Sequence, residues 1–211
     1  SGLKLIRHDP ATSEEFTEIV KPLWVAEGQP FRRPLSKEEL AFVTNEQMMC
    51  HLDFRYWCER YCTIAYDGVV GGGIGKLKLG ASQLILLDLI GKIQAEQYDR
   101  QSRGETVDGI MIAAHKARQV WYTALARALQ MHRATTIAHS RCIGVSVDDQ
   151  KIQEVYERDL LAYDNLPWFL KPPLLYQEKN AHLSFGTNAN KSKIGYMIDA
   201  KKGSLGQGSQ F

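Results

Sequence analysis

A short basic and polar segment, residues 115–119, holds the side chains with the clearest potential for chemistry. It follows an apolar, β-branched-rich run, Val107–Ala114, and precedes an alanine- and leucine-rich run that opens with Thr123. That order predicts a strand, a tight loop and a helix, which is the layout of a phosphate-binding loop. Lys116 and Arg118 supply cations for phosphate oxygens, and Thr123 supplies a hydroxyl at the helix start, where such loops hold Mg²⁺.

The same segment also fits an ordinary strand-to-helix turn that carries surface charges. The Gly-Lys pair that usually precedes the metal-binding hydroxyl is absent, because Trp121 and Tyr122 stand there instead. A glycine-rich stretch elsewhere, residues 67–75, has no Lys-Ser/Thr pair after it at phosphate-loop spacing. We therefore interpret that stretch as a hairpin connection rather than as a second phosphate loop.

The composition is that of a folded domain. Hydrophobic residues make up 44% of the 211 residues, enough for one substantial domain or one domain with an extension. A net charge of +2 neither demands nor excludes a nucleic-acid partner. No apolar run approaches the roughly 18 residues that span a bilayer, and no signal peptide is visible. The four cysteines lack the partners of a metal site, so we expect reduced, buried thiols, as in a cytosolic protein.

The elements that must position the loop are predicted from periodicity and capping signals. A Ser cap followed by an acid three residues later starts a helix at Ser36, and Ser82 is the expected cap of a second strong helix. The helices are expected over 36–50, 51–61, 81–101, 123–132 and 149–164, and the strands over 62–65, 107–114, 142–147, 182–185 and 194–198. Strands alternating with helices in the middle of the chain predict an α/β domain with a parallel sheet. The runs 182–185 and 194–198, with Gly and Asn between them, are expected to form a strand pair.

Several segments between residues 55 and 211 resemble a known protein family. The segment KARQVWYT, residues 116–123, resembles the variant Walker A motif of the large terminase subunits of tailed double-stranded DNA phages and prophages. Other segments resemble elements of that family in the same order: RYWCERYCTI (55–64), ASQLILL (81–87, its Q-motif), NLPWFLKP (165–172) and NKSKIGYMIDAKKGSLGQGSQF (190–211). The resemblance implies a P-loop NTPase-like parallel sheet with flanking helices. Residues 1–35 would form an N-terminal extension, and residues 36–211 would form the ATPase-domain segment.

The resemblance also implies roles for individual residues. Gln83 would hydrogen-bond the adenine edge, and Thr123 would bind Mg²⁺. Lys116 would supply the cation on the phosphates, while Arg118 and Gln119 would shape the loop or contact the γ-phosphate. Lys201 and Lys202 would contact the phosphate backbone of DNA, which makes binding salt-dependent.

The implied protein is the ATPase of a viral DNA-packaging motor, with ATP and Mg²⁺ as cofactors. Its implied partners are double-stranded DNA, a portal protein, a small terminase subunit and further copies of itself, in the cytoplasm of a bacterial host and away from membranes.

Two departures from the family pattern shape the expectation. Trp121 stands where a glycine normally lets the backbone wrap the phosphates. The chain also stops at Phe211, before the expected Walker B strand and without the nuclease domain, so the fold is expected to be incomplete at its C-terminus and hydrolysis by the chain alone very slow. Two alternatives stay open: another P-loop nucleic-acid motor of helicase type, and a non-catalytic nucleic-acid-binding or assembly module that has lost nucleotide binding.

Overall fold

A computed structural model describes residues 5–9, 13–23, 33–66, 73–107, 109–112, 122–146, 149–178 and 182–198. The chain divides into two compact units. The larger unit contains Ser1–Leu77 and Arg127–Phe211, and the smaller unit contains Lys78–Ala126. Within the described residues, no helix is both long and apolar enough to cross a membrane.

Three helices open the larger unit: α1 (Glu14–Leu23), α2 (Lys37–Leu52) and α3 (Phe54–Tyr61). The predicted cap of α2 is confirmed, because the Ser36 hydroxyl accepts from the Glu39 N–H and the Glu39 carboxylate accepts from the Ser36 N–H. The Arg33 guanidinium, followed by the Ser36 N–H, lowers the pKa of Glu39 to about 2. Described parts of the predicted N-terminal extension pack on α2, where the Phe16 and Phe42 rings lie 5.7 Å apart.

Two short strands follow, β1 (Thr63–Ala65) and β2 (Ile74–Lys76), and they pair antiparallel. This pairing confirms the interpretation of the glycine-rich stretch as a hairpin connection, although residues 67–72 of that connection lie outside the described residues.

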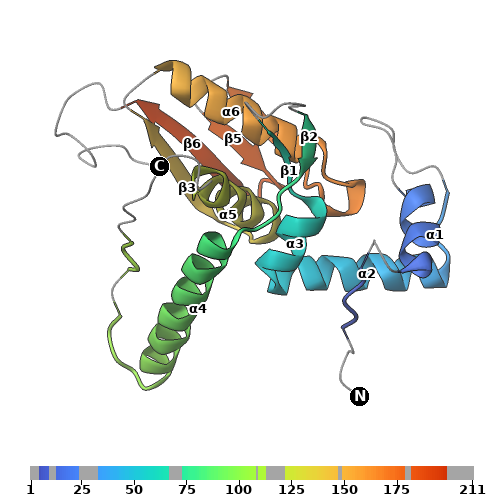
Figure 1. Cartoon of the computed structure of the whole chain (residues 1–211), viewed down its shortest axis with the longest axis horizontal. Coiled ribbons are helices and arrows are strands. Elements are labelled where there is room, and N and C mark those ends of the chain that lie inside the picture. Colours follow the sequence, from blue (N-terminus) through green and yellow to red (C-terminus); the bar gives the residue numbers. More distant parts are fainter. Residues whose placement is uncertain are drawn as a thin grey trace. The chain divides into compact units, whose positions relative to one another are not determined.

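The main sheet has four strands: β3 (Arg141–Ser146), β4 (Leu174–Glu178), β5 (His182–Phe185) and β6 (Ser192–Ile198). Their order is β3-β6-β5-β4, and only the β3–β6 pair is parallel (Figure 1). The predicted α/β class is therefore confirmed, but the predicted parallel sheet is wrong, because the sheet is mixed. The reason lies in the connections, since parallel neighbours need a crossover of about a dozen residues, whereas 186–191 suffices only for an antiparallel turn. Gly186, at φ +99°, makes this turn, and a Cβ there would lie 2.6 Å from the Asn190 carbonyl oxygen.

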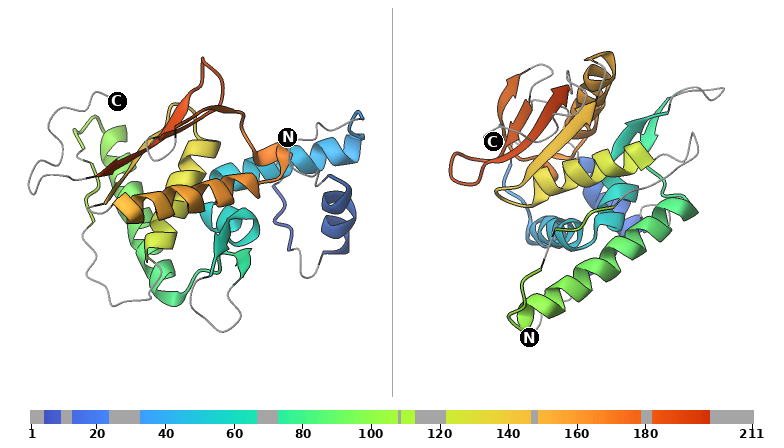
Figure 2. Two further views of the ribbon diagram at one scale, coloured as in Figure 1. Left: turned by 90° about the horizontal axis from the view of Figure 1, so that it is seen from above. Right: turned by 90° about the vertical axis from the view of Figure 1, so that its left-hand side faces the viewer.

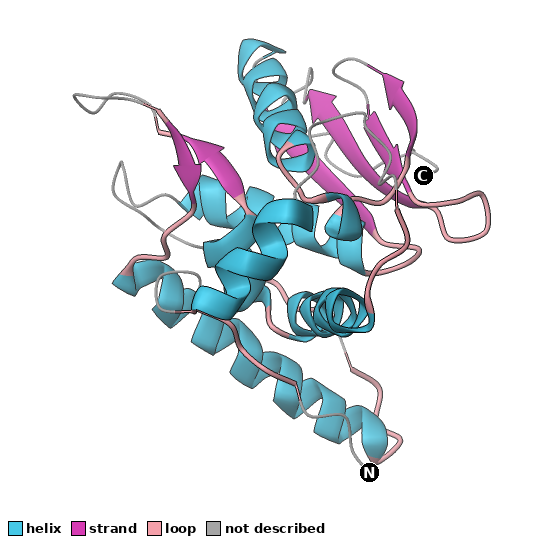
Figure 3. Ribbon diagram, turned by 90° about the vertical axis from the view of Figure 1, so that its right-hand side faces the viewer, coloured by secondary structure: helices cyan, strands magenta, loops and turns pink. Residues whose placement is uncertain are grey.

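Helix α6 (Asp149–Asp164) runs along one face of this sheet, as Figures 2 and 3 show. Aromatic pairs hold it there: the Tyr163 and Phe185 rings are 5.0 Å apart, and the Tyr156 and Tyr196 rings are 5.4 Å apart. The helix ends before a 3-10 turn, η1 (Trp168–Leu170), as the prolines of that segment predict. The strand predicted over 142–147 is confirmed as β3, which forms an edge of the sheet, so that Val145 is 48% exposed.

The described part of the smaller unit contains α4 (Ala81–Ser102) and the start of α5 (Tyr122–Thr136). The strand predicted over Val107–Ala114 is not formed at residues 107 and 109–112, which belong to neither sheet. A strand needs a hydrogen-bonding partner, and the described residues of this unit supply no other strand. Met111 is accordingly 95% exposed. Residues 108, 113 and 114 of the predicted strand lie outside the described residues.

Candidate functional site

The N-terminus of α4 is built around Gln83. The N-cap residue is Gly80, not the expected Ser82, and its N–H donates to the Gln83 Oε1 at 2.8 Å. Since glycine has no side chain to accept a hydrogen bond, the carboxamide three residues later contributes the reciprocal half of a capping box. Gln83 is only 3% exposed. Gln83, the residue predicted to contact adenine, therefore uses one acceptor lone pair of its side-chain oxygen to cap α4.

The N-terminus of α5 lies beside that of α4 in the smaller unit. The Tyr122 hydroxyl donates to the Ser82 carbonyl oxygen at 3.4 Å, a long hydrogen bond. Thr123 follows in the first turn of α5 and is exposed. The first N–H groups of a helix have no intrahelical acceptor, and they carry the positive end of the helix dipole, so this turn can accept an anion. The structure thus brings together the helix starts that carry Gln83 and Thr123.

The remaining predicted site residues are Lys116, Arg118, Gln119, Lys201 and Lys202, and all five lie outside the described residues, as does Trp121. Among the described residues, no group of three or more His, Cys, Asp or Glu side chains could hold a metal ion. The residue predicted to hold the Mg²⁺, Thr123, lies among the described residues, where it is exposed.

A buried ionic network that sequence reasoning missed lies one turn further along α5. Arg127 donates through Nε and Nη2 to the Asp159 Oδ1 of α6 at 3.1 and 2.8 Å. The Nη2 group also donates to the Val155 carbonyl oxygen at 2.7 Å, and the Tyr196 hydroxyl of β6 donates to the Asp159 Oδ2 at 2.8 Å. Burial raises the pKa of Asp159, although Arg127 and Tyr196 act in the opposite direction. No local signal marks these residues, because they are separated by 32 and 37 positions in the sequence.

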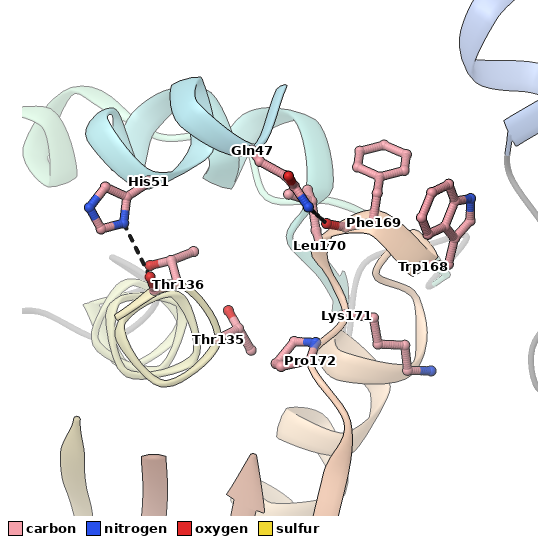
Figure 4. Close-up of a pocket in the computed structure, with 9 residues that line it drawn as sticks. All are labelled: Gln47, His51, Thr135, Thr136, Trp168, Phe169, Leu170, Lys171 and Pro172. Atoms are coloured by element: carbon pink, nitrogen blue, oxygen red, sulfur yellow. Dashed lines mark hydrogen bonds between the residues drawn. The ribbon is translucent and has the colours of Figure 1, made fainter. Parts of the chain in front are cut away.

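A cavity of about 400 Å³ in the larger unit contains none of the predicted site residues (Figure 4). It lies where the ends of α2 and α5 face η1, and its walls include Thr135, Leu170 and Pro172. At one side, the His51 Nδ1 lies 3.1 Å from the Thr136 carbonyl oxygen, and the Gln47 Nε2 donates to the Phe169 carbonyl oxygen at 2.7 Å. These bonds tie the three elements together, so the contacts on its walls are those of a structural junction.

A second histidine completes this junction from the other side. The His132 Nε2 of α5 lies 2.7 Å from the Cys50 carbonyl oxygen in the last turn of α2, and its ring packs between Phe54 and Trp57 at 5.3 and 5.2 Å. Each helix therefore offers a histidine to a carbonyl oxygen near the end of the other helix. Burial is the main cause that lowers the pKa of His132. The hydrogen bond with the Cys50 carbonyl oxygen and the charge of Asp53 oppose this shift, while nearby His51 and Arg133 add to it.

This lowered pKa predicts a loss of stability in mild acid. Below an unfolded-state pKa of about 6.5, the unfolded chain binds a proton at His132 that the folded chain does not yet bind. The free energy of unfolding should therefore fall as the pH drops from about 7.5 towards 5.5. We expect His132→Gln, which keeps a hydrogen-bond donor without titrating, to flatten this part of the profile in urea unfolding. An identical pH profile for both proteins would contradict the assignment, and His139→Gln at an exposed position is the control.

Comparison of the sequence with protein-family models and with curated proteins gave no match in either case.

Proposed function

We propose that this chain is the nucleotide-binding part of a viral DNA-packaging ATPase of the large terminase type. In this proposal it binds ATP with Mg²⁺, and the assembled motor couples hydrolysis to the movement of double-stranded DNA into a procapsid. The partners are duplex DNA at Lys201 and Lys202, the portal protein, the small terminase subunit and further copies of the chain. The setting is the cytoplasm of an infected bacterium.

One observation carries the proposal furthest: the hydrogen bond from Tyr122 to Ser82, which joins the starts of α4 and α5. A nucleotide needs a group that reads the base and a helix start that receives the phosphates. Gln83 and Thr123 belong to these two adjacent helix starts, although they are far apart in the sequence. The motif order in the sequence and the mixed α/β fold are compatible with this assignment.

Each of the two residues has a defined task in the proposed site. A Gln carboxamide carries both an N–H₂ donor and an oxygen acceptor, the combination that can pair with an adenine edge, and the Gln83 oxygen already accepts from the Gly80 N–H. Thr123 presents an exposed hydroxyl at the positive end of α5, where it would help to hold the Mg²⁺ that accompanies a bound nucleotide. In this proposal Lys116 would supply the cation on the phosphates, and Arg118 and Gln119 would shape the loop or contact the γ-phosphate.

Titration of a fluorescent ATP analogue with and without Mg²⁺ tests the proposal. Gln83→Glu keeps an oxygen acceptor for the Gly80 N–H, so the α4 cap is preserved while the amide donor to adenine is lost. We expect this variant to bind ATP about 10-fold more weakly, since a hydrogen bond to a ligand is worth about 1–1.5 kcal/mol. Thr123→Val should remove most of the Mg²⁺-dependent gain in affinity.

The matched control is Thr135→Val in the last turn of α5. Its hydroxyl donates to the Met131 carbonyl oxygen, so the chemical change is the same at the other end of the helix. Folded protein that fails to bind the analogue would refute nucleotide binding by this chain. Binding by a Trp121→Gly variant alone would favour the second candidate, an assembly or nucleic-acid-binding module in which the indole blocks the phosphate loop. That candidate is favoured by the presence of tryptophan at a position where the loop needs glycine.

A further inference from the structure

The Arg127–Asp159–Tyr196 network is enclosed to an unusual degree for charged groups. The Asp159 side chain is 2% exposed and the Arg127 side chain 13% exposed. Taking two charges out of water costs free energy that their attraction often does no more than offset. Replacing such a pair by apolar residues is frequently neutral or stabilising, so stability alone does not account for its presence.

The position of the network next to the start of α5 offers a better explanation for the presence of this buried ion pair. Arg127 lies four residues after Thr123, one helical turn along α5, so the two side chains lie on the same side of the helix. The guanidinium contacts the Asp159 carboxylate through two nitrogens and the Val155 carbonyl oxygen through one of them. A planar group held by this set of contacts restrains the rotation of α5 about its own axis as well as its distance from α6.

The third member extends the restraint into the sheet. Tyr196 donates to the second oxygen of Asp159, and its ring packs edge-on against Tyr156 of α6. The carboxylate is thus oriented by β6 and in turn orients Arg127 on α5. The buried carboxylate of Asp159 on α6 thus accepts hydrogen bonds both from the sheet, through Tyr196, and from α5, through Arg127.

We infer that Arg127 is a positioning residue, which acts through Asp159 and Tyr196 to set the rotation of α5 and so to present Thr123 to the Mg²⁺ of a bound nucleotide. This inference rests on the proposed function for its ligand, but the restraint on α5 stands on the contacts alone. Residues outside the coordination shell that orient a metal ligand typically contribute 10- to 100-fold to metal affinity.

The experiment separates positioning from stability with a double variant. Arg127→Met combined with Asp159→Leu removes both charges together, and both substitutions are made in a Tyr196→Phe background so that no buried hydroxyl loses its acceptor. The global stability of this double variant should then stay close to that of the Tyr196→Phe protein. We expect the gain in ATP-analogue affinity on adding Mg²⁺ to fall about tenfold in the double variant, while binding without Mg²⁺ changes little. Tyr163→Phe is the control, since it removes a hydroxyl of the same helix that donates to the Pro172 carbonyl oxygen instead.

Hydrogen exchange of the amides of residues 126–130 measures the restraint on α5 without any nucleotide. These amides bond to the first carbonyl groups of α5, so their exchange reports opening of its first turns. We expect faster exchange there in the double variant at equal urea midpoint and unchanged exchange in Tyr163→Phe. Unchanged exchange in the double variant would overturn the inference, as would full retention of the Mg²⁺ effect. If the unchanged protein binds no nucleotide while the exchange result holds, the proposed function fails and the restraint on α5 remains.

Discussion

Asp159→Ala is expected to lower the free energy of unfolding by about 3–5 kcal/mol. The substitution removes the acceptor of both Arg127 and Tyr196, and it leaves a guanidinium that is 13% exposed without its carboxylate. The Val155 carbonyl oxygen alone cannot satisfy the guanidinium, which has five N–H donors. Removing one partner of a buried ion pair is therefore far more costly in stability than replacing both partners by apolar residues.

Urea unfolding monitored by tryptophan fluorescence measures this loss, and Glu154→Ala is the control on the exposed face of the same helix. We expect the control to stay within about 0.5 kcal/mol of the unchanged protein. A double-mutant cycle with Arg127→Met should show that the second substitution costs much less in the Asp159→Ala background than alone. A loss below about 1 kcal/mol for Asp159→Ala would mean that water reaches the guanidinium and that the pair is not enclosed.

Local signals in the sequence were sufficient for most helices of this fold. The Ser36 cap with Glu39 three residues later is a self-contained unit, because both of its hydrogen bonds join residues three apart. The helix over Asp149–Asp164 has an acid at its start and prolines after its end, so its bounds were also predictable. Such features depend on neighbours in sequence and not on the rest of the fold.

The strands depended on distant partners, and there the sequence was a poorer guide. The apolar run at residues 107–112 has a strand-like composition, yet it has no partner in its unit and forms no ladder among the described residues. Strand β4 was not predicted, because Leu174–Glu178 directly follows prolines and shows no clean alternation. The direction of β5 and β6 followed from the short loop between them, a constraint on topology that periodicity does not express.

The candidate site shows the same division. Gln83 was identified from a motif, and the structure adds that its oxygen caps α4, a use that the predicted Ser82 cap had obscured. Arg127 and Asp159 could not be found in this way, because a buried ion pair between positions 32 apart resembles two ordinary surface charges in the sequence. Only the packing of α5 against α6 distinguishes them.

Glu46→Ala is the second substitution with a large expected effect, again about 3–5 kcal/mol. Glu46 lies on α2, is completely buried, and its two oxygens accept from the hydroxyls of Tyr56, at 2.5 Å, and Tyr61. Burial and the neighbouring carboxylate raise the pKa of both tyrosines, which keeps them protonated as donors. Truncation leaves two buried hydroxyls without their acceptor, at about 1–3 kcal/mol each, and adds a cavity.

Glu46→Gln separates the hydrogen bonds from the volume. The carboxamide fills the same space, its oxygen accepts from one tyrosine, and its N–H₂ group can donate to the other hydroxyl. We therefore expect it to lose less than half as much stability as Glu46→Ala in urea unfolding, with exposed Glu38→Ala losing less than about 1 kcal/mol. Equal losses for Gln and Ala would show that the negative charge itself is required. In that case the candidate for the cation that this charge balances is the half-buried Arg60, whose guanidinium lies 4.3 Å from the centre of the Tyr56 ring.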